Sequence, residues 1–559
     1  MRTIPVQAGS RPGPRSRIAV VVIHGMGEQE PMQTLRGFVN TVWERDASLF
    51  KGLREPKSFD PSHAWTEPDD LSGSMELRRV TTRGTRDPTS PDPDHLGVRA
   101  DFFELHWADL TVDTTWGDFR RWLTRMLWRR PAEVPPRLGL MWVLLWLLVA
   151  SIFVSGLASP LPKLLETLGL DASWLRRIFS GSYWAWLAAI SLAVGGLVKG
   201  FATAYFGDVA RYVSAAPHNI RVRKEARERG LKLLSEITNA TNTHTTNAPS
   251  ATGQPDYKYD RIVLVGHSLG SILAHDLVWL AWNELSREPY LDGSPTHLAV
   301  QECERTGYDL LVSAGAQESS SGILGDGRRA YVARPKVRLP SFDDKLAAYR
   351  LAQRNLFRHL ARGEDLKKRW LISDLVTIGS PLTHASVLTA RNAKDLEAKV
   401  NLREVLHCPL LDNDEDERHY RFSYQLPLLA GETQPRWQMH HGSAMGPVRW
   451  TNIHDASGPW SFPFGDLISG PLSYIENSPN FGPGVVDVRV KIRRTGLLAR
   501  VGLSRLFTHT RYWNCEQNPP NTDNAPEHVM ALRDAINVLD DEAVDRRLLA
   551  RAKTAPAAR

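Results

Sequence analysis

A serine at position 268 has the sequence context of a catalytic nucleophile. It is the centre of a Gly-x-Ser-x-Gly pentapeptide between a short β-branched apolar run at 259–265 and apolar residues at helical spacing at 271–278. A strand, this pentapeptide and a helix predict a nucleophile elbow, which exposes the serine hydroxyl at the end of a sheet. Small residues are required there, because the two backbone segments approach too closely for a Cβ. The supporting residues of this motif are Gly266, His267 and Gly270.

A second glycine-rich turn is suited to bind the negative charge that forms when a serine attacks an ester. It follows an apolar strand at 18–23, and its backbone can approach a substrate carbonyl closely. The backbone N–H groups of Met26 and Leu269 are therefore predicted to form an oxyanion hole. Taken alone, the segment would be an ordinary turn, and its pairing with the elbow favours the functional interpretation. The turn comprises His24, Gly25, Met26 and Gly27.

The composition excludes several other classes of protein. The chain has 559 residues and a net charge of +7, with acidic and basic residues interspersed and no recognisable RNA- or DNA-binding module, so nucleic acid is not an expected partner. Three widely spaced cysteines indicate neither a disulfide framework nor a metal site, and they suit a reducing compartment. The adjacent His440 and His441 have no carboxylate or cysteine at ligand spacing. We predict no metal and no cofactor.

The candidate residues require a sheet whose strands end close together. Apolar runs alternate with amphipathic helical segments, which predicts an α/β protein with a mostly parallel sheet. An irregular insertion is expected at 288–343, with its most disorder-like part at 315–327, and a second insertion at 400–447. The expected strands are 18–23, 75–81, 98–110, 259–265, 370–378, 448–455 and 485–492, and the expected helices are 32–45, 220–240, 271–278, 344–362 and 527–538.

Three segments together resemble lipase-type α/β-hydrolases, of the kind related to GPI inositol deacylases and bacterial lipases. They are Val-Ile-His-Gly-Met-Gly at 22–27, Val-Gly-His-Ser-Leu-Gly-Ser at 265–271 and Val-Thr-Ile-Gly-Ser-Pro at 376–381. The resemblance implies an α/β-hydrolase fold, a Ser-His-Asp triad and ester hydrolysis without a cofactor. With the acid and histidine segments described next, it covers the catalytic loops between residues 17 and 515, but neither the insertions nor the apolar region at 138–206.

The resemblance also implies where the other two triad members lie. In similar hydrolases the acid follows the strand at 448–455, in a segment like Asp-Leu-Ile, and Asp466 matches that segment. Asp455, closer to the strand end, is the alternative, because an aromatic insertion lengthens this loop relative to the family. The family's histidine lies in the loop after the last strand, which implies His509. The order Ser268, Asp466, His509 is that of α/β-hydrolases.

Two uncharged segments predict a membrane hairpin. The segments at 138–159 and 181–198 are each long enough to span a bilayer, and a basic, tryptophan-bearing amphipathic helix at 115–137 precedes them. Because the strands at 18 and 261 should share one sheet, the number of crossings must be even. Arginine and lysine residues are frequent before the first segment and after the second. By the positive-inside rule, this places the catalytic part on the cytoplasmic side of a bacterial-type inner membrane. A pair of buried helices or an apolar lid is the alternative.

The expected organisation is a hydrolase domain in two parts, 17–114 and 207–545, separated by the hairpin region at 138–206. A flexible N-terminus at 1–16, without a secretory signal, and a basic tail at 546–559 flank it. The sequence thus predicts a membrane-anchored serine hydrolase that cleaves acyl esters of membrane lipids through an acyl-enzyme. The alternatives are a tethered thioesterase or small-ester hydrolase and a non-catalytic membrane scaffold; the complete triad order argues against the scaffold.

Overall fold

A computed structural model of the chain places most of the predicted elements. It describes residues 16–25, 30–51, 63–72, 76–86, 97–111, 124, 127–134, 138–158, 165–168, 171, 173, 217–242, 256–314, 316–323, 329–333, 339–363, 365–388, 390, 392–410, 422–428, 433–455, 464–473, 481–493, 500, 505, 508–513 and 525–554.

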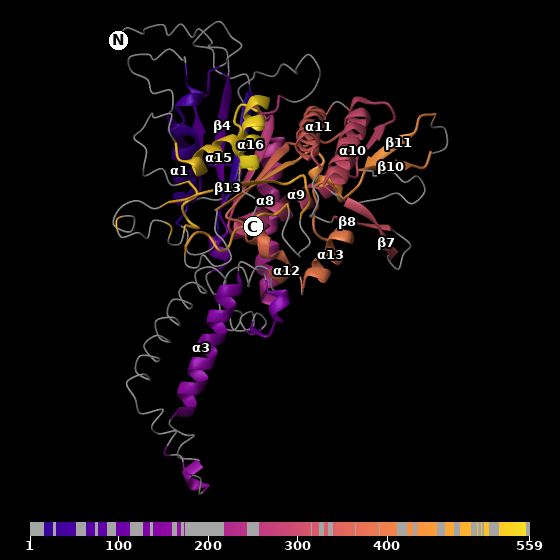
Figure 1. Cartoon of the computed structure of the whole chain (residues 1–559). Helices are drawn as coiled ribbons and strands as arrows, with labels where there is room; N and C mark the ends of the chain where they lie inside the picture. Colours follow the sequence, from indigo (N-terminus) through magenta and orange to yellow (C-terminus); the bar gives the residue numbers. More distant parts are fainter. Residues whose placement is uncertain are drawn as a thin grey trace, which may run out of the picture.

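A large central sheet runs through the molecule (Figure 1). Within the described residues it has eight strands in the order β13-β12-β9-β5-β1-β4-β3-β2. The six strands from β13 to β4 are mutually parallel, and β3 and β2 continue the sheet in antiparallel pairings. The bounds are β1 (Ser16–Ile23), β2 (Ala64–Pro68), β3 (Arg78–Thr82), β4 (Val98–Leu105), β5 (Arg261–His267), β9 (Ile372–Ile378), β12 (Arg449–Asp455) and β13 (Val486–Val490).

The parallel strands coincide with six of the runs that the sequence predicted as strands. Residues of β5, β9 and β12 are buried throughout, as expected for parallel strands covered on both faces. The predicted pairing of the first strand with the elbow strand is confirmed, because Val22 of β1 lies beside Val265 of β5. The chain is therefore an α/β protein with a mostly parallel central sheet.

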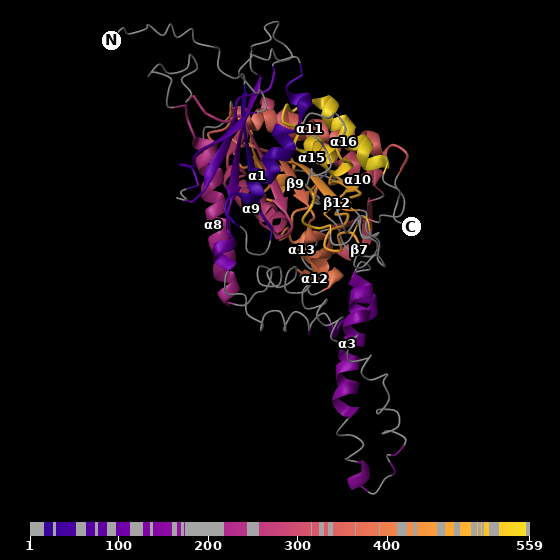
Figure 2. The ribbon, with the colours of Figure 1, turned by 90° about the vertical axis from the view of Figure 1, so that its left-hand side faces the viewer.

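Helices cover both faces of this sheet (Figure 2). On β5, Arg261 and Gly266 point to opposite faces, because side chains alternate along a strand. Arg261 reaches the carbonyl of Ile536 in α15, whereas Gly266 lies against Ser271 of α9. The principal helices of the body are α1 (Gln33–Val39), α8 (Pro217–Asn239), α9 (Leu269–Leu285), α11 (Phe342–Arg362), α15 (Glu527–Ile536) and α16 (Glu542–Thr554).

The predicted irregular insertion contains regular elements, and the prediction of irregularity was wrong there. The insertion at 288–343 contains β6 (Pro289–Leu291), α10 (Pro295–Ser313), β7 (Ala316–Ile323) and β8 (Arg329–Ala333). The hydroxyl of Ser294 accepts the His297 N–H and caps α10, with Pro295 at its first position, which is a regular helix start. The basic tail is also largely helical, as α16. β6 joins β10 (Ser423–Leu426) and β11 (Arg436–Met439) in a small sheet.

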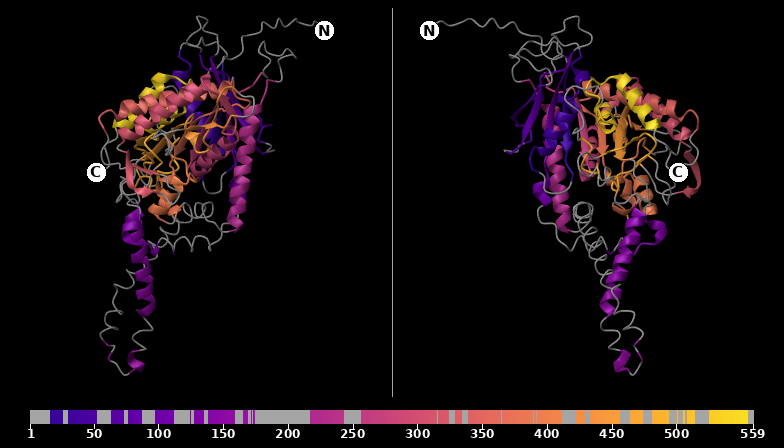
Figure 3. Two further views of the ribbon diagram at one scale, coloured as in Figure 1. Left: turned by 90° about the vertical axis from the view of Figure 1, so that its right-hand side faces the viewer. Right: turned by 60° about the vertical axis from the view of Figure 1, so that its left-hand side comes forward.

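The apolar region forms a projecting helix. α3 (Gly139–Ala158) covers most of the first predicted span and extends away from the sheet and its helices in each view (Figures 1 to 3). Across the part of the chain that the structure describes, no helix is long and apolar enough to cross a membrane. The second predicted span at 181–198 lies outside the described residues. So does most of the predicted interfacial helix at 115–137, of which only 124 and 127–134 are described.

Candidate active site

Ser268 lies at a strained turn between β5 and α9. Its backbone angles are φ 53° and ψ −127°, a conformation that a residue with a side chain rarely adopts. A Cβ on Gly266 would lie 2.5 Å from the Ser271 Cα, and one on Gly270 would lie 2.4 Å from the Ile23 carbonyl oxygen. Both glycines are thus required by close backbone packing, as the elbow pattern predicts.

The structure brings Ser268, His509 and Asp466 into one hydrogen-bonded line. The Nε2 atom of His509 is 2.9 Å from the Ser268 Oγ, and its Nδ1 atom is 2.9 Å from the Asp466 Oδ2. An ionised carboxylate only accepts hydrogen bonds, so Nδ1 carries the proton that His509 donates to Asp466. In the neutral ring, Nε2 is then free of a proton and accepts the Ser268 hydroxyl.

Two loops at the carboxyl edge of the sheet hold the acid and the histidine. Asp466 follows β12, and His509 follows β13, the neighbouring parallel strand. The loops are joined by backbone hydrogen bonds, because Gly465 N–H donates to the Arg505 carbonyl at 2.6 Å and Thr508 N–H donates to the Gly465 carbonyl at 3.3 Å. The residue before each triad member is therefore fixed by the other loop.

Asp466 is held in its ionised form. Burial opposes ionisation, but the charge of His509 and hydrogen bonds from His509, Tyr512 and Ser469 outweigh it and hold the pKa of Asp466 well below its ordinary value. Its Oδ1 also accepts the backbone N–H groups of Ile468 at 2.9 Å and Ser469 at 3.3 Å. Such a carboxylate orients the imidazole and stabilises its cation without taking up the proton.

The alternative acid, Asp455, is placed where it supports the histidine loop. It ends β12 and accepts hydrogen bonds from the Thr508 hydroxyl and, at 2.9 Å, from the Arg505 guanidinium. Burial raises its pKa above the ordinary value, against the hydrogen bond from Thr508 and the charge of Arg505. Asp466, rather than Asp455, is the carboxylate that His509 reaches.

His267, within the pentapeptide, contacts the backbone of the candidate base. Its Nε2 lies 3.0 Å from the His509 carbonyl oxygen, and its ring packs edge-on against Trp513. Burial lowers the pKa of His267 to about 3, so the ring is neutral and its Nε2–H donates to that carbonyl. The residue before the nucleophile thus fixes the position of the base.

The segment predicted to supply the oxyanion hole begins beside the nucleophile. A Cβ on Gly25 would lie 2.8 Å from the Ser268 Cβ. His24 is buried and anchored, because its Nδ1 lies 2.8 Å from the Gly25 carbonyl oxygen and its Nε2 accepts the Trp107 N–H at 3.1 Å. Leu269, the other predicted donor, is the first residue of α9. Met26 and Gly27 lie outside the described residues.

Tyr512 is a site residue that the sequence interpretation missed. Its hydroxyl donates to the Asp466 Oδ2 at 2.7 Å, and its ring lies against Gly379, where a Cβ would approach the ring to 2.9 Å. Gly379 has φ +60°, which favours glycine and explains its place in the Gly-Ser-Pro turn after β9. The position of Tyr512 three residues after His509 was the available signal, but spacing alone does not show which carboxylate it contacts.

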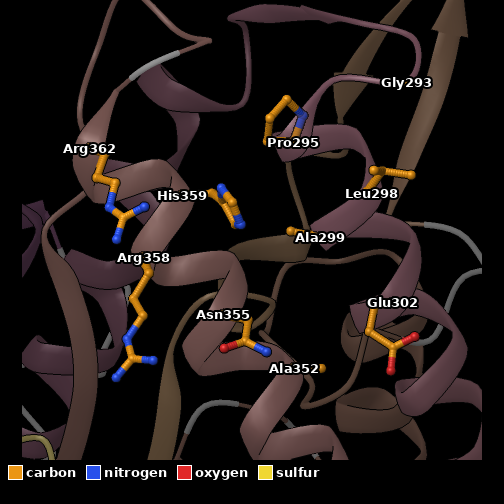
Figure 4. Close-up of a pocket in the computed structure, with 10 residues that line it drawn as sticks. All are labelled: Gly293, Pro295, Leu298, Ala299, Glu302, Ala352, Asn355, Arg358, His359 and Arg362. Carbon is orange, nitrogen blue, oxygen red and sulfur yellow. The ribbon is translucent and has the colours of Figure 1, made fainter.

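Other features of the described residues do not add to this site. A pocket of about 440 Å³ lies between α10 and α11, away from the triad (Figure 4). Among the described residues, no group of three or more histidine, cysteine, aspartate or glutamate side chains could hold a metal ion. The pocket is lined by Gly293, Pro295, Leu298, Ala299, Glu302, Ala352, Asn355, Arg358, His359 and Arg362.

Comparison with family models, curated proteins and solved structures finds no match for this chain. What the site can do must therefore be argued from its geometry. A hydroxyl, an imidazole and an ionised carboxylate at hydrogen-bonding distances can activate an oxygen nucleophile and then return a proton to a leaving group.

Proposed function

We propose that the protein is a serine ester hydrolase of the α/β-hydrolase type. The observation that carries the proposal is the hydrogen-bonded line from the Ser268 hydroxyl through His509 to Asp466. The strained elbow supports it, because backbone strain of this kind is typical of functional sites. The chain order of the three residues, and their places after β5, β12 and β13, support the hydrolase type.

The proposed reaction proceeds through an acyl-enzyme. The Ser268 oxygen attacks the ester carbonyl carbon while His509 Nε2 accepts its proton, giving a tetrahedral oxyanion. Backbone N–H groups, for which we propose those of Met26 and Leu269, stabilise that charge. The ester C–O bond then breaks, and His509 returns the proton to the leaving alkoxide. In the second half, His509 removes a proton from water while the water oxygen attacks the acyl carbon. The bond between that carbon and the Ser268 oxygen then breaks, His509 returns the proton to the Ser268 oxygen, and the free acid leaves.

We propose acyl esters of membrane lipids as the substrates. α3 carries large apolar side chains in the open, with Leu147 59% and Phe153 66% exposed. α12 (Ala385–Leu388), which follows the carboxyl end of β9, lies on the side of the molecule from which α3 extends (Figures 1 and 2). Ser268 follows β5, so it lies at the same carboxyl edge of the sheet as the end of β9. Contact of α3 with lipid would therefore bring the site close to a bilayer.

The two-pass hairpin, with the catalytic part in the cytoplasm, stays part of the proposal. Extraction of membranes with alkaline carbonate tests it separately from the chemistry. A chain with a membrane-spanning hairpin resists extraction, whereas a chain bound only at the surface is released. Release would overturn the hairpin and leave surface contact by α3.

Hydrolysis of vesicles tests the chemistry. Purified protein is incubated with vesicles of phosphatidylcholine and phosphatidylglycerol, and free fatty acid is measured alongside labelling by a fluorophosphonate. We expect both signals in the wild type, their loss in Ser268→Ala, and no change in Ser341→Ala, a serine at the start of α11 whose side chain makes no capping hydrogen bond.

Each other outcome selects a different function. Labelling of Ser268 without fatty acid release, together with faster cleavage of short-chain p-nitrophenyl esters or thioesters than of long-chain ones, would favour the tethered small-ester hydrolase or thioesterase. Absence of both labelling and hydrolysis in the folded wild type would overturn the hydrolase proposal and favour the scaffold.

A further inference from the structure

The hydroxyl of Tyr512 takes part in three hydrogen bonds, one of which is to the Asp466 carboxylate of the triad. It lies 2.7 Å from the Asp466 Oδ2, 2.9 Å from the Ser469 Oγ and 3.0 Å from the Asp455 backbone nitrogen. All of these groups are buried. Asp466 Oδ2 therefore accepts two hydrogen bonds, from His509 on one side and from Tyr512 on the other.

The direction of each bond at this hydroxyl follows from counting protons. An ionised carboxylate has no proton to give, so the single Tyr512 proton points to Asp466. The Asp455 N–H only donates, and it occupies one lone pair of the tyrosine oxygen. Ser469 is then the donor in its contact with the remaining lone pair, and its hydroxyl also hydrogen-bonds to Asp466. The chain of donors runs from Ser469 through Tyr512 to Asp466, and every bonding position of the tyrosine oxygen is used.

We propose that Tyr512 is a positioning residue of the triad. Its hydroxyl fixes the rotamer of Asp466, and the negative charge of Asp466 is divided between the hydrogen bonds from Tyr512 and His509. This inference rests on the proposed hydrolase function. Two donors on one carboxylate oxygen divide its charge, and each weakens the pull on the other. Tyr512 therefore both orients the acid and limits how strongly the imidazolium is stabilised.

Tyr512→Phe tests the proposal by a change that a purely structural role would not produce. With the second donor gone, the full charge of Asp466 acts on His509, and the imidazolium form is stabilised. Since the base must be neutral to act, we expect the acidic limb of the pH profile of kcat/KM to move upward by about half to one pH unit. The looser acid should also lower kcat by about tenfold.

A second readout needs no substrate. The Nδ1 proton of His509, shared with Asp466, should give a far-downfield proton resonance whose shift reports the strength of that bond. We expect the resonance to move in Tyr512→Phe and to stay unchanged in Tyr424→Phe, the same chemical change on exposed β10. Ser469→Ala leaves the tyrosine in place but weakens its donation and removes the hydrogen bond from the Ser469 hydroxyl to Asp466, so it should move both readouts in the same direction by a smaller amount.

The outcomes separate this inference from the proposed function. Failure of the wild type to react with any ester or with fluorophosphonate would remove the function, while the resonance would still test the contact. An active Tyr512→Phe variant with an unchanged pH profile and resonance would overturn the role of Tyr512 alone. If Tyr512→Phe does not fold, unchanged readouts in folded Ser469→Ala would also overturn it.

Discussion

At the scale of single residues, the turn that carries Ser268 depends on the close approach of two backbone segments. A Cβ on Gly270 would lie 2.4 Å and 2.5 Å from the carbonyl oxygens of Ile23 and His24, and backbone atoms cannot move aside as a flexible side chain would. Gly270→Ala should therefore lower the free energy of unfolding by about 3 kcal/mol and slow fluorophosphonate labelling of Ser268, because the loop that carries Gly25 is displaced.

The matched control for this change is Gly139→Ala, at the start of α3. A Cβ on Gly139 meets no atom within 4 Å, so this variant should lose no stability in the same denaturant titration. A Gly270→Ala variant as stable and as reactive as the control would show that the elbow and the His24 turn are further apart than the structure places them.

Glu104, a buried carboxyl on β4, predicts a pH dependence of stability. Burial raises its pKa to about 7 from an ordinary 4.5, although the hydrogen bond from the Met32 N–H opposes this. The folded protein holds this proton more tightly than the unfolded chain, so stability falls as pH rises from 4.5 to 7. Between pH 5 and pH 8 this group should cost about 2 kcal/mol.

The test compares the pH dependence of two proteins. Glu104→Gln keeps an oxygen acceptor for the Met32 N–H but cannot ionise, so its unfolding free energy should fall about 2 kcal/mol less than that of the wild type between pH 5 and pH 8. Subtracting the pH-dependent change in unfolding free energy of one protein from that of the other cancels the contribution of the titrating groups that both proteins share. Equal pH dependence in the two proteins would mean that Glu104 is ionised in the folded state at neutral pH.

The role of a residue could be predicted from the sequence where a local motif specifies it. Ser268 was recognisable because its strand, glycines and helix are contiguous in the chain. The choice between Asp466 and Asp455 was not, because it depends on how two loops pair, and the structure has Asp455 holding Thr508 while Asp466 reaches His509. Tyr512 was missed for the same reason.

At the scale of elements, a buried ion network fastens the C-terminal helices to the sheet. Asp374 on β9 accepts hydrogen bonds from Arg261 of β5 at 2.6 Å and from Arg449 of β12 at 2.9 Å. Arg261 also donates to the Asn537 carbonyl, and Arg449 donates to Asp540, both of which lie between α15 and α16. Asp374 thus holds the two guanidinium groups that contact the segment between these helices.

Removal of that carboxylate charge should destabilise the fold. Asp374→Asn leaves two buried guanidinium groups without their shared charge, and we expect a loss of about 3–5 kcal/mol in the free energy of unfolding, measured by denaturant titration. Glu302→Gln, which breaks the exposed pair with Arg305, is the control and should cost less than about 1 kcal/mol. Similar losses in both variants would contradict the structural role of the network.

The sheet strands were predictable because each is a short apolar run, whereas the insertion at 288–343 was not. Its main helix, α10, has an amphipathic sequence with polar residues throughout, so composition favoured an irregular segment. The local start signal, Ser294 followed by Pro295, marks only the first turn and does not show how far the helix extends. The packing of α10 on α11, which no local pattern encodes, accounts for its apolar face.

At the scale of the whole molecule, the proposed contact with lipid depends on α3. Leu147 and Phe153 are large apolar side chains exposed on a helix that extends from the side of the body where α12 lies (Figure 2). Burial of such a side chain in an apolar medium is worth about 1.5–3 kcal/mol. The pair should therefore supply a substantial part of the binding energy for a lipid surface.

Vesicle flotation tests this directly. The double variant Leu147→Gln, Phe153→Gln should bind vesicles of phosphatidylcholine and phosphatidylglycerol at least tenfold more weakly than the wild type, since about 1.4 kcal/mol corresponds to tenfold. The matched control, Leu298→Gln with Leu351→Gln, changes side chains that are 58% and 44% exposed on α10 and α11 of the body and should leave binding unchanged. Labelling of Ser268 by a soluble fluorophosphonate should be equal in all three proteins, because the triad is untouched, while lipid hydrolysis should fall only in the α3 variant. Equal binding by wild type and α3 variant would separate the catalytic site from the membrane and make a soluble ester the substrate to pursue.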